Sequence, residues 1–292
     1  MIREPILITG APGNVGTSVV ESLTQEGHRV RVAAWDLSAA HAAFGGGAEY
    51  VRFDFEDPGT YAAALDGVKR LFLVRPPHLA AVERQINPFV EAARTAGVEH
   101  VVLLSVMGAE HVSILPHARI EKAILASGMA YTFLRPAFFF QNLSTTFRRM
   151  IAETGEIALP LGRSRMSWVD ARDIGVAAAI ALTRMEHRNR AYTLTEQAYT
   201  VAELAEVFTH GLGRPIRYPR PSFWAYRRQM RRYGLPAGLI NLTTMMFLIA
   251  RLGLSAAVTG DLPQILGRRP LGPAEFVRDH AHLYPLRSTT TV

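Results

Sequence analysis

Three glycines, Gly10, Gly13 and Gly16, are spaced three residues apart directly after the apolar run Ile6–Thr9. A helical pattern begins immediately afterwards, so the segment has the order strand, tight turn, helix. Glycine lets the backbone turn sharply and approach a ligand closely, and the first turn of a helix attracts phosphate oxygens. The alternative is an ordinary connection with incidental glycines. The context favours a dinucleotide pyrophosphate site, formed by Thr9, Gly10, Ala11, Gly13, Asn14, Val15 and Gly16.

Apolar strand-like and amphipathic helix-like segments alternate through the first half of the chain. Strands are expected at Ile6–Thr9, Arg29–Ala34, Glu49–Phe53, Arg70–Val74, His100–Leu104 and Tyr131–Leu134. Helices are expected at Val15–Glu26, Gly59–Leu65, Leu79–Ala96 and Leu115–Ala126. This alternation predicts an α/β fold with a doubly wound parallel sheet covered on both faces. Such sheets bind ligands at the carboxyl ends of their strands.

The rhythm changes after Leu134. An irregular stretch is expected from Pro136 to Arg165, then a helix at Asp170–Leu182 and a strand at Ala191–Leu194. Thr200 and Glu203 have the spacing of a capping box, which predicts a helix through Phe208. Beyond it, prolines at 215, 219, 221 and 236 are expected to break the chain into short pieces.

The segment Gly238–Val258 is apolar enough to raise the question of a membrane. Its length is marginal for a span, and Arg251 with several polar residues interrupts it. Because its leucines and other large apolar residues recur at helical spacing, we expect a buried helix, a lid or a dimer face, and no membrane span. A monomer and a homodimer both remain open.

Composition limits the remaining classes of site. The chain of 292 residues has no cysteine, which excludes disulfides and thiolate metal sites. His78, His111, His280 and His282 lack metal-binding partners at convincing spacing, so no metal is expected. Met1–Pro5 leads straight into a strand without room for a signal peptide, which favours a cytoplasmic protein.

The net charge of +7 is distributed unevenly. Residues 207–260 contain eight arginines and no acid. This pattern suits a solvated basic face or an anionic substrate. Nucleic acid is not expected as a partner, because no recognition motif accompanies the charge.

Several further motifs carry a resemblance to a known family. They are Thr9–Gly16, Asp54-Phe55, Leu71–Leu73, His117 with Glu121, Tyr131–Pro136, Asp170–Ile174, Asp261–Pro263 and Leu266–Arg268. With these motifs the chain resembles the NmrA-like, atypical short-chain dehydrogenases/reductases over residues 5–285. The resemblance implies a Rossmann-type domain over residues 1–150, to which 166–195 return. It also implies a smaller, mainly helical substrate-binding or lid portion over 151–292.

The same resemblance implies a nicotinamide cofactor and assigns further residues to it. Asp54 would accept a hydrogen bond from the adenine amino group, with Phe55 against the ring. Arg75 and Pro76 would line the wall near the nicotinamide ribose, and Pro136 with the following backbone would border the carboxamide. Val74 is a further cofactor-binding candidate, and Ser105 occupies a strand-end position where the superfamily often has a polar hydroxyl.

Two positions depart from the family pattern. The family usually has an arginine for the 2′-phosphate of NADP where this chain has Trp35, followed by Asp36. An indole cannot pair with a phosphate, and Asp36 would favour NAD if it faced the ribose. Compensation by Arg31, Arg52 or Arg75 stays open, and NADP(H) is placed ahead of NAD(H) because the family mostly uses it.

The second departure concerns the proton donor. None of the nine tyrosines has a lysine four residues on, so the Tyr-x-x-x-Lys acid of the wider superfamily is absent. The family match places Ser113 and His117 at those positions. His117 is the candidate for catalytic help, although it could instead contact the cofactor or cap a helix. Acceptors that stabilise their own negative charge, such as quinones, do not need a strong acid.

The expected partner is therefore a small quinone-like or conjugated aromatic molecule. Phe138, Phe139, Trp168 and Trp224 are candidates for an aromatic substrate pocket, or else belong to the core. Two other functions stay open. One is a ketoreductase or enoyl reductase of an aromatic polyketide, and the other is a regulator that senses NAD(P) without catalysis.

Overall fold

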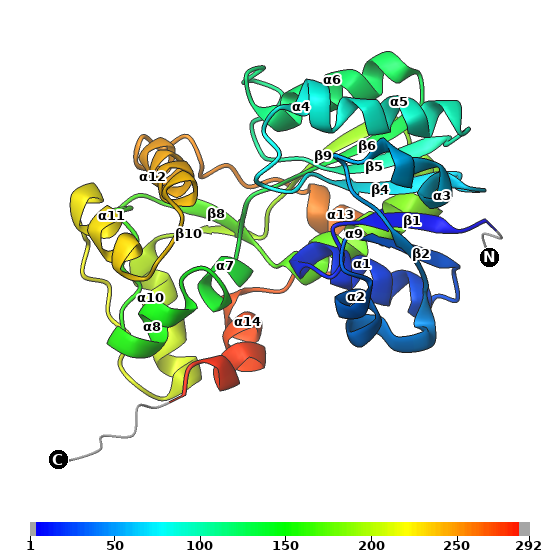
Figure 1. Ribbon diagram of the computed structural model, residues 1–292. Helices are drawn as coiled ribbons and strands as arrows, with labels where there is room; N and C mark the ends of the chain where they lie inside the picture. The colour runs from blue at the N-terminus through cyan, green and yellow to red at the C-terminus, as the bar shows by residue number, and fades with distance from the viewer. Residues whose placement is uncertain (1–3, 286–292) are drawn as a thin grey trace. The chain divides into compact units, whose positions relative to one another are not determined.

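The computed structural model describes residues 4–285, which divide into two compact units (Figure 1). Unit 1 contains the chain up to Pro136, Ala171–Leu194 and Asp261–Arg268. Unit 2 contains Ala137–Asp170, Thr195–Gly260 and the chain from Arg269. The first break thus falls after Pro136, earlier than the expected 150, and Asp261–Arg268 make a further return that the sequence did not indicate.

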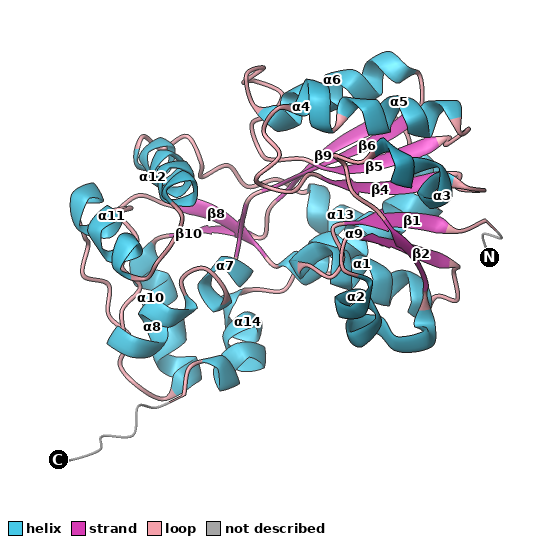
Figure 2. Ribbon diagram, viewed as in Figure 1, coloured by secondary structure: helices cyan, strands magenta, loops and turns pink. Residues whose placement is uncertain are grey.

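Unit 1 is built on a seven-stranded parallel sheet in the order β3-β2-β1-β4-β5-β6-β9 (Figure 2). Its strands are β1 Ile6–Thr9, β2 Val30–Ala34, β3 Glu49–Arg52, β4 Arg70–Val74, β5 His100–Leu104, β6 Ala130–Pro136 and β9 Arg190–Leu194. Most of their side chains are buried, since helices cover both faces. The predicted α/β, Rossmann-type class is confirmed.

Helices lie on both faces of this sheet. They are α1 Asn14–Gln25, α2 Leu37–Phe44, α3 Tyr61–Leu65, α4 Val82–Gln85, α5 Asn87–Thr95, α6 Pro116–Ser127, α9 Ala171–Thr183 and α13 Asp261–Leu266. Figure 1 shows α4, α5 and α6 on one face and α1, α2 and α9 on the other. Short 3-10 turns occur at Gly45–Gly47, Pro58–Thr60, Met185–His187 and Ala281–Leu283.

Two helical segments differ from the expectation. The helix expected over Leu79–Ala96 is interrupted, and α5 restarts with Pro88 in its first turn, where a missing N–H is tolerated. Helix α2 lies outside the helices expected from the sequence. The Asp36 carboxylate caps this helix by accepting a hydrogen bond from the Ala39 amide at 3.0 Å.

The returning segments are fastened to unit 1 by specific contacts. A Cβ added to Gly175 of α9 would overlap Ser18 of α1, so the two helices approach as closely as a glycine permits. The Asp261 carboxylate accepts a hydrogen bond from the Thr193 amide at 2.8 Å, and Arg268 pairs with the buried Asp173 at 2.6 Å. The first bond attaches α13 to β9, and the second attaches Arg268, beyond the end of this helix, to α9.

Unit 2 is mainly helical, as predicted. It contains α7 Gln141–Ser144, α8 Arg148–Thr154, α10 Val201–Leu212, α11 Phe223–Arg232, α12 Ala237–Arg251 and α14 Pro273–His280. The predicted capping box of Thr200 and Glu203 is present. A small sheet in the order β10-β8-β7 joins β7 Phe138–Phe139, β8 Met166–Val169 and β10 Gln197–Tyr199. Strand β8 pairs antiparallel with β10 and parallel with β7.

The prolines at 221 and 236 precede helices in unit 2 instead of breaking them. Ser222 caps α11 directly after Pro221, and Pro236 is itself the residue before α12. No helix within residues 4–285 is long and apolar enough to cross a membrane.

Gly175 provides a test of the α1–α9 contact. Glycine normally weakens a helix interior, so replacing it usually stabilises the helix. We expect Gly175→Val to lower the free energy of unfolding by about 1–3 kcal/mol, because the new side chain would collide with Ser18. Urea denaturation measures the change. Gly238→Ala in α12 is the control, since open space surrounds Gly238, and it should be neutral or mildly stabilising. A stabilised Gly175→Val variant would contradict the close packing.

Candidate functional site

The glycine loop lies at the carboxyl end of β1 and leads into α1. Gly10 has a φ of +73°, which favours glycine, and a Cβ there would lie 2.7 Å from Cβ of Val74. A Cβ on Gly13 would lie 2.6 Å from the Gly10 carbonyl oxygen. Gly10, Gly13 and Asn14 are exposed, whereas Ala11, Val15 and Gly16 are buried against unit 1. The loop therefore presents bare backbone to solvent at the start of a 12-residue helix.

Thr9 has a structural role in this arrangement. Its buried hydroxyl donates to the Phe72 carbonyl at 3.1 Å and accepts from the Val74 amide at 2.8 Å. These bonds fix the ends of β1 and β4 relative to each other. The hydroxyl of Thr9 is thus used within the protein.

Trp35 and Asp36 follow β2 and are both exposed. Trp35 is 65% exposed, and the guanidinium carbon of Arg52 lies 6.0 Å from the centroid of its ring. Because the Asp36 carboxylate caps α2, one of its oxygens is occupied by the Ala39 amide.

Asp54 and Phe55 follow β3. The Asp54 carboxylate is partly buried and accepts from the Glu56 amide at 2.9 Å. Phe55 is mostly buried, with its ring edge-on to Phe53 and Phe89. It also lines a cavity of about 270 Å³, whose other lining residues are Glu56, Pro58, Tyr61, Arg84, Gln85 and Pro88.

Arg75 follows β4, next to Pro76. Its Nη1 donates to the carbonyls of Pro76, Pro77 and Leu79 at 2.9–3.1 Å, so the guanidinium organises its own loop. Burial lowers the pKa of Arg75 from its ordinary value. Its Nε is buried and has no hydrogen-bond acceptor within residues 4–285.

His117 lies in the first turn of α6. Burial lowers the pKa of His117 to about 4, and the positive charge of Arg75 contributes to the same shift. The imidazole is therefore neutral at pH 7. A neutral imidazole can donate or accept one hydrogen bond, but it does not supply the proton of an imidazolium.

A buried polar network adjoins the end of β5. The Ser105 hydroxyl donates to Glu121 at 2.5 Å, and Arg135 binds both oxygens of the same carboxylate at 3.0 and 2.7 Å. Glu110 approaches the other side of Arg135 at 3.4 Å. Hydrogen bonding to Glu121 is the main cause that raises the pKa of Arg135.

Of this network, the sequence predicts only Ser105 as a site residue. The hydroxyl of Ser105 uses its single proton on Glu121, so toward a ligand it can only accept. The position of Glu121 one turn after His117 on a helix was the available signal. Near it, the buried Pro136 at the end of β6 accepts the Met107 amide at 3.1 Å.

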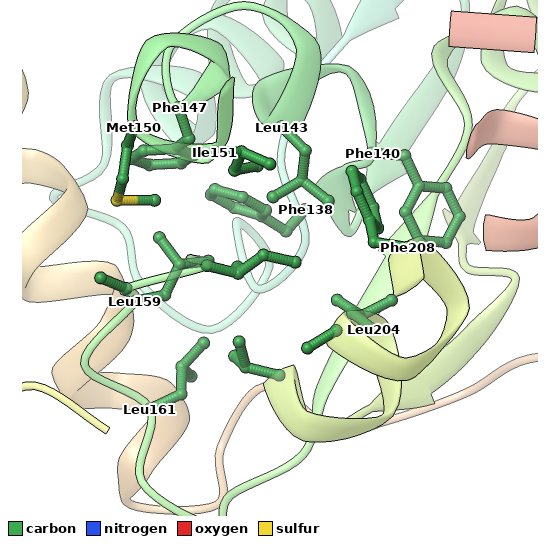
Figure 3. Close-up of a cluster of buried hydrophobic side chains, with 14 of the residues drawn as sticks. Phe138, Phe140, Leu143, Phe147, Met150, Ile151, Leu159, Leu161, Leu204 and Phe208 are labelled. Carbon is green, nitrogen blue, oxygen red and sulfur yellow. The ribbon is translucent and has the colours of Figure 1, made fainter. Parts of the chain in front are cut away.

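The aromatic candidates of unit 2 have different environments. Trp168 is fully buried, stacked on Phe140 and edge-on to Phe138. Figure 3 shows Phe138 and Phe140 within the large apolar core of this unit. Phe139 is partly buried. Trp224 is 68% exposed, with Arg228 4.6 Å from the centroid of its ring. Trp168 and Phe138 thus have core positions, whereas Trp224 is available at the surface of its unit.

The cofactor candidates of unit 1 occupy the carboxyl ends of β1 to β6, one set after each strand. The described part of the chain holds no group of three or more histidines and carboxylates able to bind a metal ion.

The Glu121–Arg135 pair gives a testable coupling. Removing one partner of a buried pair leaves an uncompensated charge, so Glu121→Ala should lower the free energy of unfolding by about 3 kcal/mol. In a double-mutant cycle with Arg135→Ala, we expect a coupling of about 1–3 kcal/mol from chemical denaturation. The exposed pair Arg149–Glu153 on α8 is the control, with an expected coupling below about 0.5 kcal/mol. Equal couplings for the two pairs would contradict a special role for this network.

The chain is similar to known proteins in sequence and in fold. The sequence model of the NmrA-like family matches residues 3–254. An NAD(P)H azoreductase of Xenophilus azovorans is 34% identical over 281 residues, which cover 94% of this chain and 98% of that protein.

Two solved structures are similar over nearly their whole length. Triphenylmethane reductase of Citrobacter sp., in complex with NADP(H), has a TM-score of 0.85 and 25% identity, covering 94% of this chain and 99% of that chain. NADPH-dependent quinone oxidoreductase 2 of Escherichia coli, in complex with NADPH, has a TM-score of 0.84 and 25% identity, covering 96% and 100%. These relatives are NAD(P)H-dependent oxidoreductases, and the chain belongs to the NmrA-like family of atypical short-chain dehydrogenases/reductases.

Proposed function

We propose that this protein is an NAD(P)H-dependent reductase that transfers a hydride to a quinone-like or other conjugated aromatic acceptor. The exposed glycine loop between β1 and α1 is the observation that carries the proposal. It offers a pyrophosphate unobstructed backbone amides and the positive end of a 12-residue helix. The azoreductase, dye reductase and quinone oxidoreductase named above support the choice of acceptor.

The residues after the other strands would hold the rest of the cofactor. Asp54 retains a carboxylate oxygen for the adenine amino group, and Phe55 lines the cavity beside it. Arg75 and Pro76, which follow β4, would line the nicotinamide ribose. NADP(H) is favoured over NAD(H), because both solved relatives contain the phosphorylated cofactor.

The nicotinamide would supply the hydride, and the protein would orient it against the acceptor. At the same edge of unit 1, Ser105 could accept a hydrogen bond from the carboxamide, next to Pro136. Neither Ser105 nor the neutral His117 is a strong acid at pH 7. Reduction of a simple ketone would leave an alkoxide that needs a proton. Reduction of a quinone leaves a phenolate, whose conjugate acid has a pKa of about 10. The site therefore suits acceptors that stabilise their own charge.

The substrate would be a small conjugated molecule that needs apolar contacts. Among the aromatic candidates of unit 2, Trp224 and Phe139 keep exposed surface for a ligand, whereas Phe138 and Trp168 already fill the core of that unit. A regulator that senses NAD(P) would bind the cofactor and reduce no acceptor, so turnover separates it from the reductase.

Gly13 tests the cofactor site. We expect Gly13→Val to weaken NADPH binding by at least about 100-fold, roughly 2.7 kcal/mol, because its Cβ would collide with the Gly10 carbonyl and distort the loop. Isothermal titration gives the dissociation constants. Gly46→Val in the same unit is the control, since no atom lies within 4 Å of the added Cβ. Unchanged NADPH affinity in a folded Gly13→Val protein would reject the site.

His117 tests the chemistry. We expect His117→Ala to lower kcat with a naphthoquinone by about tenfold, the loss of one hydrogen bond of about 1.4 kcal/mol. Since His117 has a pKa of about 4, the wild-type profile of kcat against pH should show no step near 6.5. A step near 6.5 that disappears in His117→Ala would show an acid role, and full activity of the variant would remove His117 from catalysis.

The lowered pKa values of two histidines make the stability of the protein depend on pH. His100 and His117 both have pKa values of about 4 in the folded protein, below the ordinary 6.5. The unfolded chain therefore binds more protons between these values, and stability falls as pH drops from 6.5 toward 4. Assays between about pH 6.5 and 8.5 avoid most of this loss.

A further inference from the structure

We propose that Arg52, at the end of β3, binds the 2′-phosphate of NADP(H). The inference rests on the proposed function and names the residue that would separate NADPH from NADH at that site. In a Rossmann fold the adenosine ribose lies beside the residues that follow the second strand, and a nearby arginine accommodates the phosphate. Here the residue that follows β2 is Trp35, which has no positive charge.

The sheet register places Arg52 beside this position. Ala34, the last residue of β2, pairs with Arg52, the last residue of β3. The Arg52 guanidinium lies 6.0 Å from the centroid of the Trp35 ring, and both side chains are exposed. A cation over an indole face is attracted by the ring, so Trp35 can hold the guanidinium at the strand ends.

The other two arginines that the sequence offers are engaged elsewhere. Arg31 binds Glu49 and donates to the carbonyls of Ala64 and Asp66. Arg75 donates to three carbonyls of its own loop. Arg52 makes no hydrogen bond or ion pair with any residue between 4 and 285. Its full set of donors is therefore available to a phosphate, which guanidinium groups bind in a bidentate manner.

Asp36 is the nearby charge that opposes a phosphate. Its carboxylate caps α2 by accepting the Ala39 amide, and the positive end of that helix partly offsets the charge. Asp36 should therefore weaken NADPH binding without preventing it. Asparagine caps helices about as well as aspartate, so Asp36→Asn removes the charge and keeps the cap.

The test is isothermal titration of the full chain with NADPH and with NADH. We expect Arg52→Ala to raise the Kd of NADPH by about 10–100-fold and to change that of NADH by less than about twofold. Arg29→Ala is the matched control, because this exposed arginine precedes β2 at its opposite end and pairs with Glu49. It should change neither Kd by more than about twofold. Far-UV circular dichroism checks that each variant is folded.

Two further variants are expected to strengthen binding of the 2′-phosphate instead of weakening it. Asp36→Asn and Trp35→Arg should each lower the ratio of the NADPH Kd to the NADH Kd by about 3–10-fold, since one removes repulsion and the other adds a guanidinium. The probe 2′,5′-ADP should follow NADPH in every variant, whereas 5′-ADP should follow NADH.

The outcomes separate the two proposals. If the wild type binds both cofactors and Arg52→Ala weakens both equally or neither, Arg52 does not read the 2′-phosphate and the inference is overturned, while the reductase proposal stands. If the wild type binds neither cofactor, both proposals fail. A selective loss of NADPH and 2′,5′-ADP in Arg52→Ala alone supports the inference.

Discussion

The carbonyl oxygen of Gly10 limits which residues can occupy the loop at the candidate site. A Cβ at position 13 would lie 2.6 Å from this oxygen, and a Cβ at position 16 would also collide with it. Both positions must therefore be glycine for the loop to take this conformation. On the other side Gly10 abuts Val74, and Thr9 bonds both Phe72 and Val74, so β1, β4 and α1 are fixed together at one point. The exposed amides keep a defined direction because of this packing.

The two candidate proton donors among residues 4–285, Ser105 and His117, do not supply a strong acid. Glu121 accepts a hydrogen bond from the Ser105 hydroxyl and pairs with Arg135, while burial lowers the pKa of His117 and keeps it neutral. Such a site can orient a cofactor and accept hydrogen bonds, yet it offers little help to a product that must be protonated at once. The absence of a Tyr-x-x-x-Lys motif and the contacts of Ser105 thus favour the same acceptors for separate reasons.

The central strands β1, β4 and β5 of unit 1 could be predicted because they are nearly continuous apolar runs whose side chains are mostly buried, whereas the edge strands β3 and β9 are more polar and less buried. The small sheet of unit 2 could not be predicted, because β7, β8 and β10 are two to four residues long and pair only through distant parts of the chain. The effect of proline depends on its position. Pro88 lies in the first turn of α5, where the expected longer helix is divided, whereas Pro236 directly precedes α12 and does not break a helix. In the site, the glycine loop could be predicted because its three glycines are close together in the sequence. The contacts that distinguish Arg52 from Arg31 and Arg75 depend on tertiary structure and could not be inferred from spacing.

Hydrogen exchange read by mass spectrometry tests the central claim most directly, because it reports on the loop amides themselves. Adding saturating NADPH should slow exchange in peptides that contain Gly10–Gly16 and the first turn of α1, while peptides from the Gly45–Gly47 turn stay unchanged. If NADPH binds and these loop peptides exchange at the same rate with and without it, the pyrophosphate lies elsewhere and the account is wrong.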